Sequence, residues 1–124
     1  MIWLDSPSDP SNPAERPGGP GRALVAIEVE VGPDTITVVL IGELDITTRP
    51  VLAERLLPIL GTRRRRLVLD LAGTEFMDCG SARLIASARW WLPDDARLVV
   101  RRPSRAVRRV LELTGLDAFC EIEG

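Results

Sequence analysis

Acidic and small polar residues gather where the sequence predicts that a strand passes into a helix. The stretch FMDCGSARLI, residues 76–85, follows the hydrophobic run RLVLDLAG and contains Asp78, Cys79, Gly80 and Ser81. An acid, a thiol and a hydroxyl beside the free N–H groups of a helix start could contact a partner or react. The sequence therefore predicts a functional site at this joint and leaves open whether it does chemistry.

Several side chains that most enzymes depend on are absent from the sequence. All 16 basic residues are Arg, and the chain contains no His, Lys or Tyr. Their absence removes histidine-based catalysis, the commonest metal ligand and Schiff-base chemistry. The sequence also lacks a phosphate loop of Walker spacing and a carboxylate paired with a nucleophile. We therefore expect no enzyme activity, no cofactor and no metal site.

The acids and the thiol near the joint have structural as well as functional interpretations. Asp78 is expected to contact a partner or to cap the helix backbone. A helix start favours the thiolate of Cys79, but Asp78 opposes it, so a small half-buried side chain is favoured over a redox role. Glu43 and Asp45 end another predicted strand and are expected to extend an acidic contact patch with Asp78, the alternative being simple loop solvation.

Length and composition fit one globular domain of ordinary character. The chain has 124 residues, 45% hydrophobic and 27% charged, with a net charge of −2. This charge gives no global field that favours nucleic acid or membrane, and no apolar run reaches the roughly 18 residues of a membrane span. Two cysteines form no disulfide framework, and no export signal is visible. We expect a cytoplasmic protein that binds neither nucleic acid nor membrane.

The elements must bring these residues together, and their predicted order is β-β-α-β-α-β-α-β after a Pro-rich tail. Residues 1–22 hold five of the ten prolines and predict a disordered N-terminal tail, in which only MIWL could dock, so that the folded domain covers 23–124. Strand–helix alternation after an opening hairpin predicts an α/β fold, a mixed sheet packed with helices. Apolarity on both faces places 67–71 at the sheet centre. The predicted helices cover 48–60, 81–91 and 105–114, and Leu84, Ile85, Ala88 and Trp91 are expected to face inward.

Two further features have open interpretations. The run RRRR at 63–66 is typical of a solvated loop, although it could hold an acidic partner. Trp90 is predicted on an outer helical face, where it serves an interface or packs against the tail or a neighbouring element.

Three stretches together resemble the STAS domain of bacterial anti-sigma factor antagonists. They are LIGELDITT at 40–48, LVLDLAGTEFMDCGSARLI at 67–85 and RPSRAVRRVLELTGLDAFCEI at 102–122. The resemblance implies a STAS-like fold and a regulator that binds an anti-sigma factor, often a serine kinase of the GHKL ATPase class, and so frees a sigma factor. It also implies that the kinase ends binding by phosphorylating a Ser or Thr just after the motif aspartate.

The sequence departs from the family pattern at the position of that hydroxyl. Asp78 matches the aspartate, whereas Cys79 replaces the first Ser, Gly80 replaces the phosphorylated Ser or Thr, and Ser81 replaces the Gly. Glycine cannot be phosphorylated, and Ser81 is one position late, which turns its side chain by about 100° on a helix. Ser81 is either a substitute acceptor or a residue that satisfies the first helical turn.

The contact surface expected from the resemblance centres on the joint and includes Glu43, Asp45, Asp78, Cys79, Gly80, Ser81 and Arg83. The favoured function is that of an anti-sigma factor antagonist with a degenerate phosphoacceptor site. The alternative is a STAS scaffold that assembles with other STAS proteins and is not phosphorylated.

Overall fold

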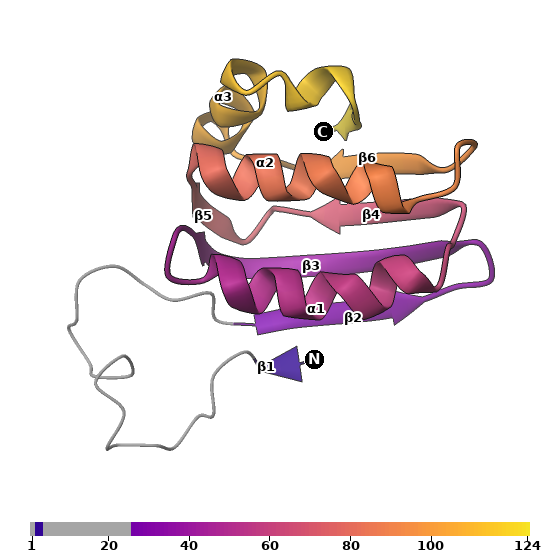
Figure 1. Ribbon diagram of the computed structural model, residues 1–124. Helices are drawn as coiled ribbons and strands as arrows, with labels where there is room; N and C mark the ends of the chain where they lie inside the picture. The colour runs from indigo at the N-terminus through magenta and orange to yellow at the C-terminus, as the bar shows by residue number, and fades with distance from the viewer. Residues whose placement is uncertain (1, 4–25) are drawn as a thin grey trace.

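A computed structural model describes residues 2–3 and 26–124 of the chain (Figure 1). The strands are β1 (Ile2–Trp3), β2 (Ala26–Val31), β3 (Thr35–Leu44), β4 (Arg66–Asp70), β5 (Thr74–Met77), β6 (Arg97–Arg101) and β7 (Glu121–Glu123). The helices are α1 (Arg49–Gly61), α2 (Cys79–Ala88) and α3 (Arg105–Leu113), with short 3₁₀ turns at η2 (Arg89–Trp91) and η3 (Leu116–Ala118).

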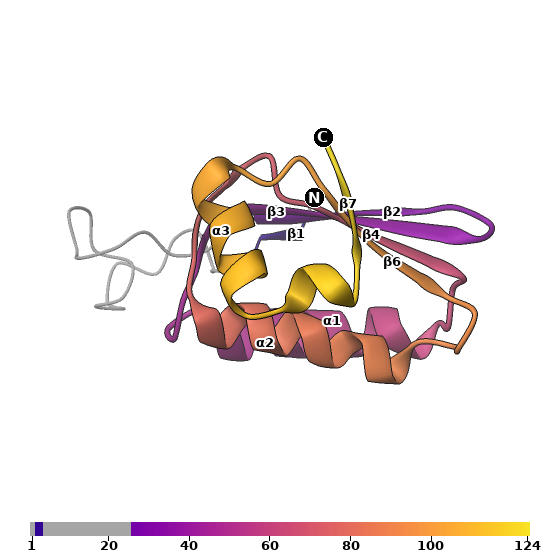
Figure 2. The same ribbon diagram turned by 90° about the horizontal axis from the view of Figure 1, so that it is seen from above.

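The strands form one mixed sheet in the order β1-β2-β3-β4-β6-β7, with β5 paired to β3. β2 and β3 form the predicted antiparallel hairpin, and β3, β4, β6 and β7 run parallel. Figure 2 shows α1 and α2 on one face of the sheet, and Figure 1 shows them side by side there. The prediction that 67–71 lies at the centre is confirmed, because β4 has β3 on one side and β6 on the other.

Burial along β3 alternates strictly and fixes which face of the sheet meets the helices. Ile36, Val38, Leu40, Gly42 and Leu44 are buried, whereas the positions that alternate with them are half-buried. The apolar side chains among them share one hydrophobic core with Leu52, Leu56 and Leu60 of α1 and with Ile85 of α2. This core anchors α1 and α2, and it therefore fixes where their N-terminal ends lie.

β5 is absent from the predicted order and places the joint. The chain leaves β4 at Asp70 and returns as β5 to pair in parallel with the end of β3, so that Leu44 faces Met77. The register shifts between Gly42 and Glu43, and Gly42 has a φ of 124°, which favours glycine. Sequence periodicity does not reveal β5, because a strand of four residues, TEFM, is too short to produce a clear alternating pattern.

The predicted helices are correct in position, but the second begins two residues earlier than expected and its last three residues form a 3₁₀ turn. α2 begins at Cys79 and ends at Ala88, and η2 continues the chain to Trp91. Ile85 and Ala88 are buried and Leu84 packs against the core, as predicted, but Trp91 is 60% exposed. The inward prediction for Trp91 is wrong because a 3₁₀ turn advances about 120° per residue and takes the side chain off the α-helical stripe.

Residues 2 and 3 differ from the predicted disordered tail. Ile2 and Trp3 form β1 and pair antiparallel with Ile27 and Ala26 at the edge of the sheet. The backbone N–H and C=O groups along the outer side of an edge strand can pair with a further strand. Here β1 is that further strand, and it pairs with β2. The rest of the predicted tail lies outside the described residues.

Candidate functional site

The joint between β5 and α2 is held by a capping carboxylate. The backbone N–H of Asp78 donates to the carbonyl of Leu44 at 2.9 Å, which ties the joint to the end of β3. The Oδ1 atom of Asp78 accepts from the backbone N–H of Ser81 at 2.7 Å. Asp78 thus caps α2, as one of the two sequence interpretations expected, and its carboxylate interacts favourably with the helix dipole.

An ion pair ties Asp78 to the first residue of α1. The Nη2 atom of Arg49 donates to Oδ2 of Asp78 at 2.8 Å, and the side chains remain 33% and 27% exposed. Burial raises the pKa of Asp78, but hydrogen bonding from Ser81 and the Arg49 guanidinium outweigh it and hold the pKa below its ordinary value of 3.8. Asp78 is therefore an ionised, partly displayed carboxylate and not a proton donor at neutral pH.

Asp45 organises the neighbouring loop between β3 and α1. Its Oδ1 accepts from the backbone N–H and the hydroxyl of Thr47 at 2.9 and 2.6 Å, and from the N–H of Thr48 at 3.2 Å. Burial raises the pKa of Asp45, but these hydrogen bonds outweigh it and lower the pKa despite the nearby charge of Asp78. Thr48 occupies the N-cap position of α1 without a side-chain cap bond, and its hydroxyl donates instead to the carbonyl of Glu43 at 2.9 Å.

The structure brings most of the predicted contact residues together. Cys79 is exposed, Gly80 is half-buried and Arg83 is exposed. Arg83 lies three and four residues after the other two and therefore shares their face of α2. The expectation of a half-buried Cys79 is wrong, because the first helical residue turns outward here. Glu43 occupies one of the half-buried positions of β3, whose side chains alternate with those of the core.

Ser81 does not share this exposed face. It is the third residue of α2 and is fully buried, at 0% exposure. Its backbone N–H donates to the capping carboxylate of Asp78, but its buried hydroxyl has no hydrogen-bond partner in the described part of the chain. The side chain of Asp78, and not that of Ser81, therefore satisfies the first helical turn. A kinase needs the hydroxyl in its own active site, and Ser81 would reach it only if the start of α2 opened.

Sequence reasoning missed Arg49, the residue that pairs with Asp78. Arg49 and Asp78 are 29 positions apart, and no local pattern links them. The one signal was Gly80. A Cβ atom built there would lie 2.8 Å from Nη1 of Arg49 and closer still to Cζ and Nη2. The missing side chain at position 80 is therefore the space that the guanidinium occupies.

The arginine run and Trp90 lie away from the joint. Arg65 pairs with Asp95 at 3.3 Å, and Arg66, which belongs to β4, pairs with Glu123 at 2.8 Å. These ion pairs show that part of the run is engaged within the chain. Trp90 is 86% exposed in η2. Beside η2, an apolar groove between α1 and α2 is lined by Ala53, Leu56, Leu57, Leu60, Leu84, Ser87, Ala88 and Trp91.

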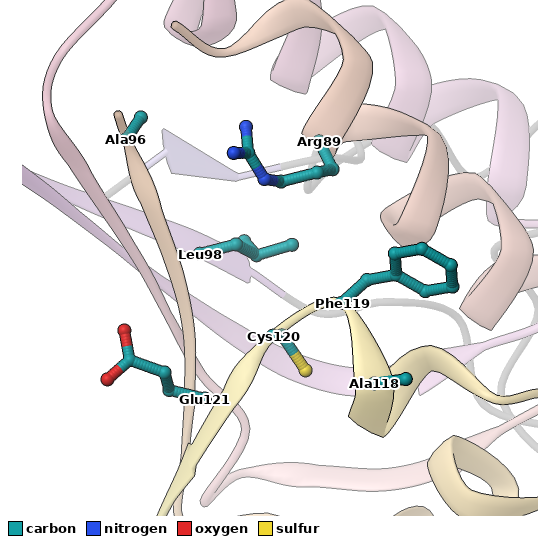
Figure 3. A pocket seen from close by; sticks show the side chains of 7 residues that line it. All are labelled: Arg89, Ala96, Leu98, Ala118, Phe119, Cys120 and Glu121. Atoms are coloured by element: carbon teal, nitrogen blue, oxygen red, sulfur yellow. The ribbon is translucent and has the colours of Figure 1, made fainter. Parts of the chain in front are cut away.

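A second hollow lies at the far end of α2, where η3 and β7 approach β6. Figure 3 shows the side chains that line it, which are Arg89, Ala96, Leu98, Ala118, Phe119, Cys120 and Glu121. Burial, together with Asp117 and Glu121, raises the pKa of the Cys120 thiol to about 11. The guanidinium of Arg89 is engaged by the carbonyls of Pro93 and Asp94. The hollow therefore offers no activated nucleophile and is a weaker candidate site than the joint.

Among residues 2–3 and 26–124, no group of three or more His, Cys, Asp or Glu side chains is arranged to hold a metal ion. No helix in this described part has the length and apolarity to cross a membrane.

The sheet, the three helices and the capped joint define a STAS domain. The family model described as "Mlab, STAS domain" matches residues 27–122, and the chain belongs to this family. The predicted α/β STAS fold is therefore confirmed. A search of curated proteins finds no match.

Solved structures of anti-sigma factor antagonists share this fold. One, from Mycobacterium paratuberculosis, is 26% identical with a TM-score of 0.74, covering 79% of this chain and 84% of that one. SpoIIAA in its unphosphorylated form is 22% identical with a TM-score of 0.67, covering 78% of this chain and 87% of its own. The phosphorylated form of this Bacillus cell fate determinant is 21% identical with a TM-score of 0.60, covering 78% and 90%.

Proposed function

We propose that this protein is a cytoplasmic, non-enzymatic anti-sigma factor antagonist that binds an anti-sigma factor through the β5–α2 joint and so frees a sigma factor. The observation that carries the proposal is the joint itself. A capped helix start displays Asp78, Cys79, Gly80 and Arg83 on one face, beside Asp45 at the end of β3. Glu43 is proposed to lie at the margin of this surface.

The make-up of this surface suits contact better than chemistry. Asp78 is engaged by Arg49 and Ser81, and Asp45 by Thr47 and Thr48, so both carboxylates are held in fixed positions. Fixed charges of both signs at the edge of a sheet provide orientation and specificity in a protein interface. The resemblance to solved antagonists in fold supports the same class of partner.

The partner is proposed to be an anti-sigma factor, with a GHKL-type serine kinase as the favoured class. This chain differs from the family pattern in how such a kinase would act on it. Position 80 carries no hydroxyl, and Ser81 is buried. The proposed complex is therefore constitutive and is not ended by phosphate at the usual position.

One observation favours the second candidate, a scaffold that assembles with other STAS proteins. An antagonist that cannot be phosphorylated at position 80 has lost the usual route of release, whereas a scaffold needs no release. The two functions differ in partner, because the antagonist binds an anti-sigma factor and the scaffold binds STAS domains.

The test is capture from native lysate of the source cells, followed by reconstitution with the purified partner. The bait is the full chain, and Gly80→Glu and Ala106→Glu are the variant baits. Both positions are the second residue of their helix, and Ala106 lies on the exposed side of α3. We expect an anti-sigma factor that is lost with Gly80→Glu and kept with Ala106→Glu, and whose sigma factor the chain displaces. Capture of STAS proteins alone would favour the scaffold.

Phosphorylation is tested on the same material. Incubation of the chain and the captured kinase with ATP, followed by mass spectrometry, should find no phosphate on residues 78–83. Phosphate on Ser81 would show that the start of α2 opens and would contradict a constitutive complex.

A further inference from the structure

Gly80 and Arg49 occupy complementary space at the centre of the candidate surface. The guanidinium of Arg49 reaches from the start of α1 across the start of α2 and pairs with Asp78 at 2.8 Å. A Cβ atom at position 80 would overlap all three terminal guanidinium atoms, with Nη1 at 2.8 Å the farthest of them. Atoms without a hydrogen bond or a covalent bond between them do not approach this closely, so a side chain at position 80 and this Arg49 conformation exclude each other.

The overlap is confined to the position that distinguishes this chain from the family pattern. Gly61 ends α1, and a Cβ atom there would meet nothing within 4 Å. Neither Gly61 nor Gly80 has a positive φ, so neither needs glycine for its backbone conformation. Glycine at position 80 therefore leaves the space in which the Arg49 guanidinium lies.

Stability alone does not explain why Arg49 lies there. The Nε atom of Arg49 is buried and meets no hydrogen-bond acceptor in the described part of the chain. A buried donor without a partner costs free energy, and an ion pair exposed by a quarter to a third returns little. The Nε atoms of Arg64 and Arg66, away from the joint, are buried and unpartnered as well, so the close fit of Arg49 against position 80 is the feature that sets the joint apart.

We propose that Arg49 is a positioning residue of the partner surface. Its guanidinium occupies the space that an acceptor side chain at position 80 would fill, and it holds Asp78 in the capping geometry. The guanidinium of Arg49, a permanent positive charge, thereby takes the place of the Ser or Thr hydroxyl that is phosphorylated in the family pattern. The meaning of this replacement for partner binding rests on the proposed function, but the mutual exclusion of Arg49 and a side chain at position 80 is a property of the isolated chain.

If the proposal is correct, restoring an accessible hydroxyl at position 80 requires changes at two residues, Gly80 and Arg49. A serine introduced at position 80 must displace Arg49, which can swing away because the overlapping atoms are the far end of a flexible side chain. Displacement breaks the ion pair and leaves a loose cation beside the new hydroxyl. Gly80→Ser alone therefore gives a disturbed joint, and Arg49→Ala combined with Gly80→Ser leaves the hydroxyl free of the overlap.

The carboxylate of Asp78 reports directly on the position of Arg49. The charged groups that act on it include Arg49 from α1 and Asp45 from the loop before α1. The Arg49 guanidinium is one of the causes that lower the pKa of Asp78. That cause is lost when Arg49 is replaced by alanine, and it is also lost when a side chain at position 80 pushes Arg49 away from Asp78.

The experiment follows the ¹³C carboxyl shift of Asp78 against pH by NMR in the full chain. Arg49→Ala and Gly80→Ala should each raise the pKa of Asp78 toward 3.8, its ordinary value. The double variant should add little to either, because each change removes the same interaction. Arg49→Lys should restore part of the lowering, since it keeps a cation, and Gly61→Ala should leave the pKa at the wild-type value.

A wild-type pKa in Gly80→Ala would overturn the proposal, because Arg49 would then keep its place beside a side chain at position 80. Additive effects of the two substitutions would overturn it as well. Failure to capture an anti-sigma factor would instead reject the proposed function and leave the NMR result standing.

Discussion

The helices α2 and α3 start in closely similar ways. Both begin after strands of the parallel part of the sheet, and in both the residue before the helix supplies a side-chain cap. Asp78 accepts from the N–H of Ser81 at 2.7 Å, and Ser104 accepts from the N–H of Val107 at 3.1 Å. The third helical residue is buried in each, at 0% exposure. The comparison explains why Ser81 is buried, since it occupies the position that holds a core valine in α3.

The Arg–Asp pairs near the two helix starts differ in burial. Beside α3, Arg102 pairs with Asp70 of β4, and the Asp70 side chain is only 6% exposed. Beside α2, Arg49 and Asp78 both remain about a third exposed. The first carboxylate serves the fold and the second is displayed to solvent. The same chemistry is therefore structural at one joint and available for recognition at the other, and the comparison can be tested at matched positions.

The largest expected effect on stability is at Asp70. Asp70→Ala removes the partner of Arg102 and the acceptor for the N–H of Ala72, which donates to Oδ1 at 3.0 Å. We expect a loss of about 2–3 kcal/mol in the free energy of unfolding, because both hydrogen bonds to a buried charged group are lost. Urea denaturation measures it. Asp70→Asn keeps an acceptor and should cost less, and equal losses for Asp70→Ala and Asp78→Ala would contradict the structural distinction.

The second expected effect concerns binding and separates the two helix starts. Gly80→Glu adds charge and bulk at the centre of the α2 surface, whereas Ala106→Glu makes the same change in charge at the matched position of α3. We expect Gly80→Glu to weaken binding of the captured anti-sigma factor roughly tenfold to a hundredfold, or about 1.4–2.8 kcal/mol. Calorimetric titration measures both affinities. An equal loss for Ala106→Glu would place the contact surface across both helices.

A smaller effect is expected one turn further along each helix. Arg83 and Arg109 are both the fifth residue of their helices and are both exposed. Arg83→Ala should lower partner affinity by about twofold to fivefold, the range for a solvent-exposed charge at an interface rim. Arg109→Ala should leave the affinity unchanged, and the same titration compares them. An unchanged affinity for Arg83→Ala would restrict the surface to the first turn of α2.

Local sequence signals predicted the caps and the central strand. Ser104 lies directly before a strongly amphipathic segment, the position that favours a capping serine, and it caps α3. Gly115 follows that helix with a φ of 75°. Two-sided apolarity identified β4 as central. These features depend on neighbours within a few residues, which is why one sequence is enough to find them.

Features that depend on distant residues were missed. β5 gains its partner only because β3 continues past the end of β4, and four residues show no usable period. The Arg49–Asp78 pair joins residues 29 positions apart. The exposed Trp91 depends on a change from α to 3₁₀ geometry at Arg89. Asp78 located the candidate surface in the sequence. The sequence could not show that the Arg49 guanidinium fills the space of a side chain at position 80.

An effect of similar size distinguishes the two caps by pH. Asp78→Asn keeps a good N-cap but removes the charge that faces Arg49 and the helix dipole, at a cost of roughly 0.5–1 kcal/mol near pH 7. The pKa of Asp78 is lowered in the folded state, so its charge stabilises the fold above the unfolded value near 3.8. That contribution is lost as the pH falls through the folded pKa. The stability difference between wild type and Asp78→Asn should therefore shrink below about pH 4.

Ser104→Ala removes an uncharged cap and should cost about 1 kcal/mol at every pH. Urea denaturation from pH 7 to pH 3 compares the two differences, and a constant cost for Asp78→Asn would mean that the carboxylate of Asp78 acts as a neutral cap and that its pair with Arg49 adds nothing to the fold.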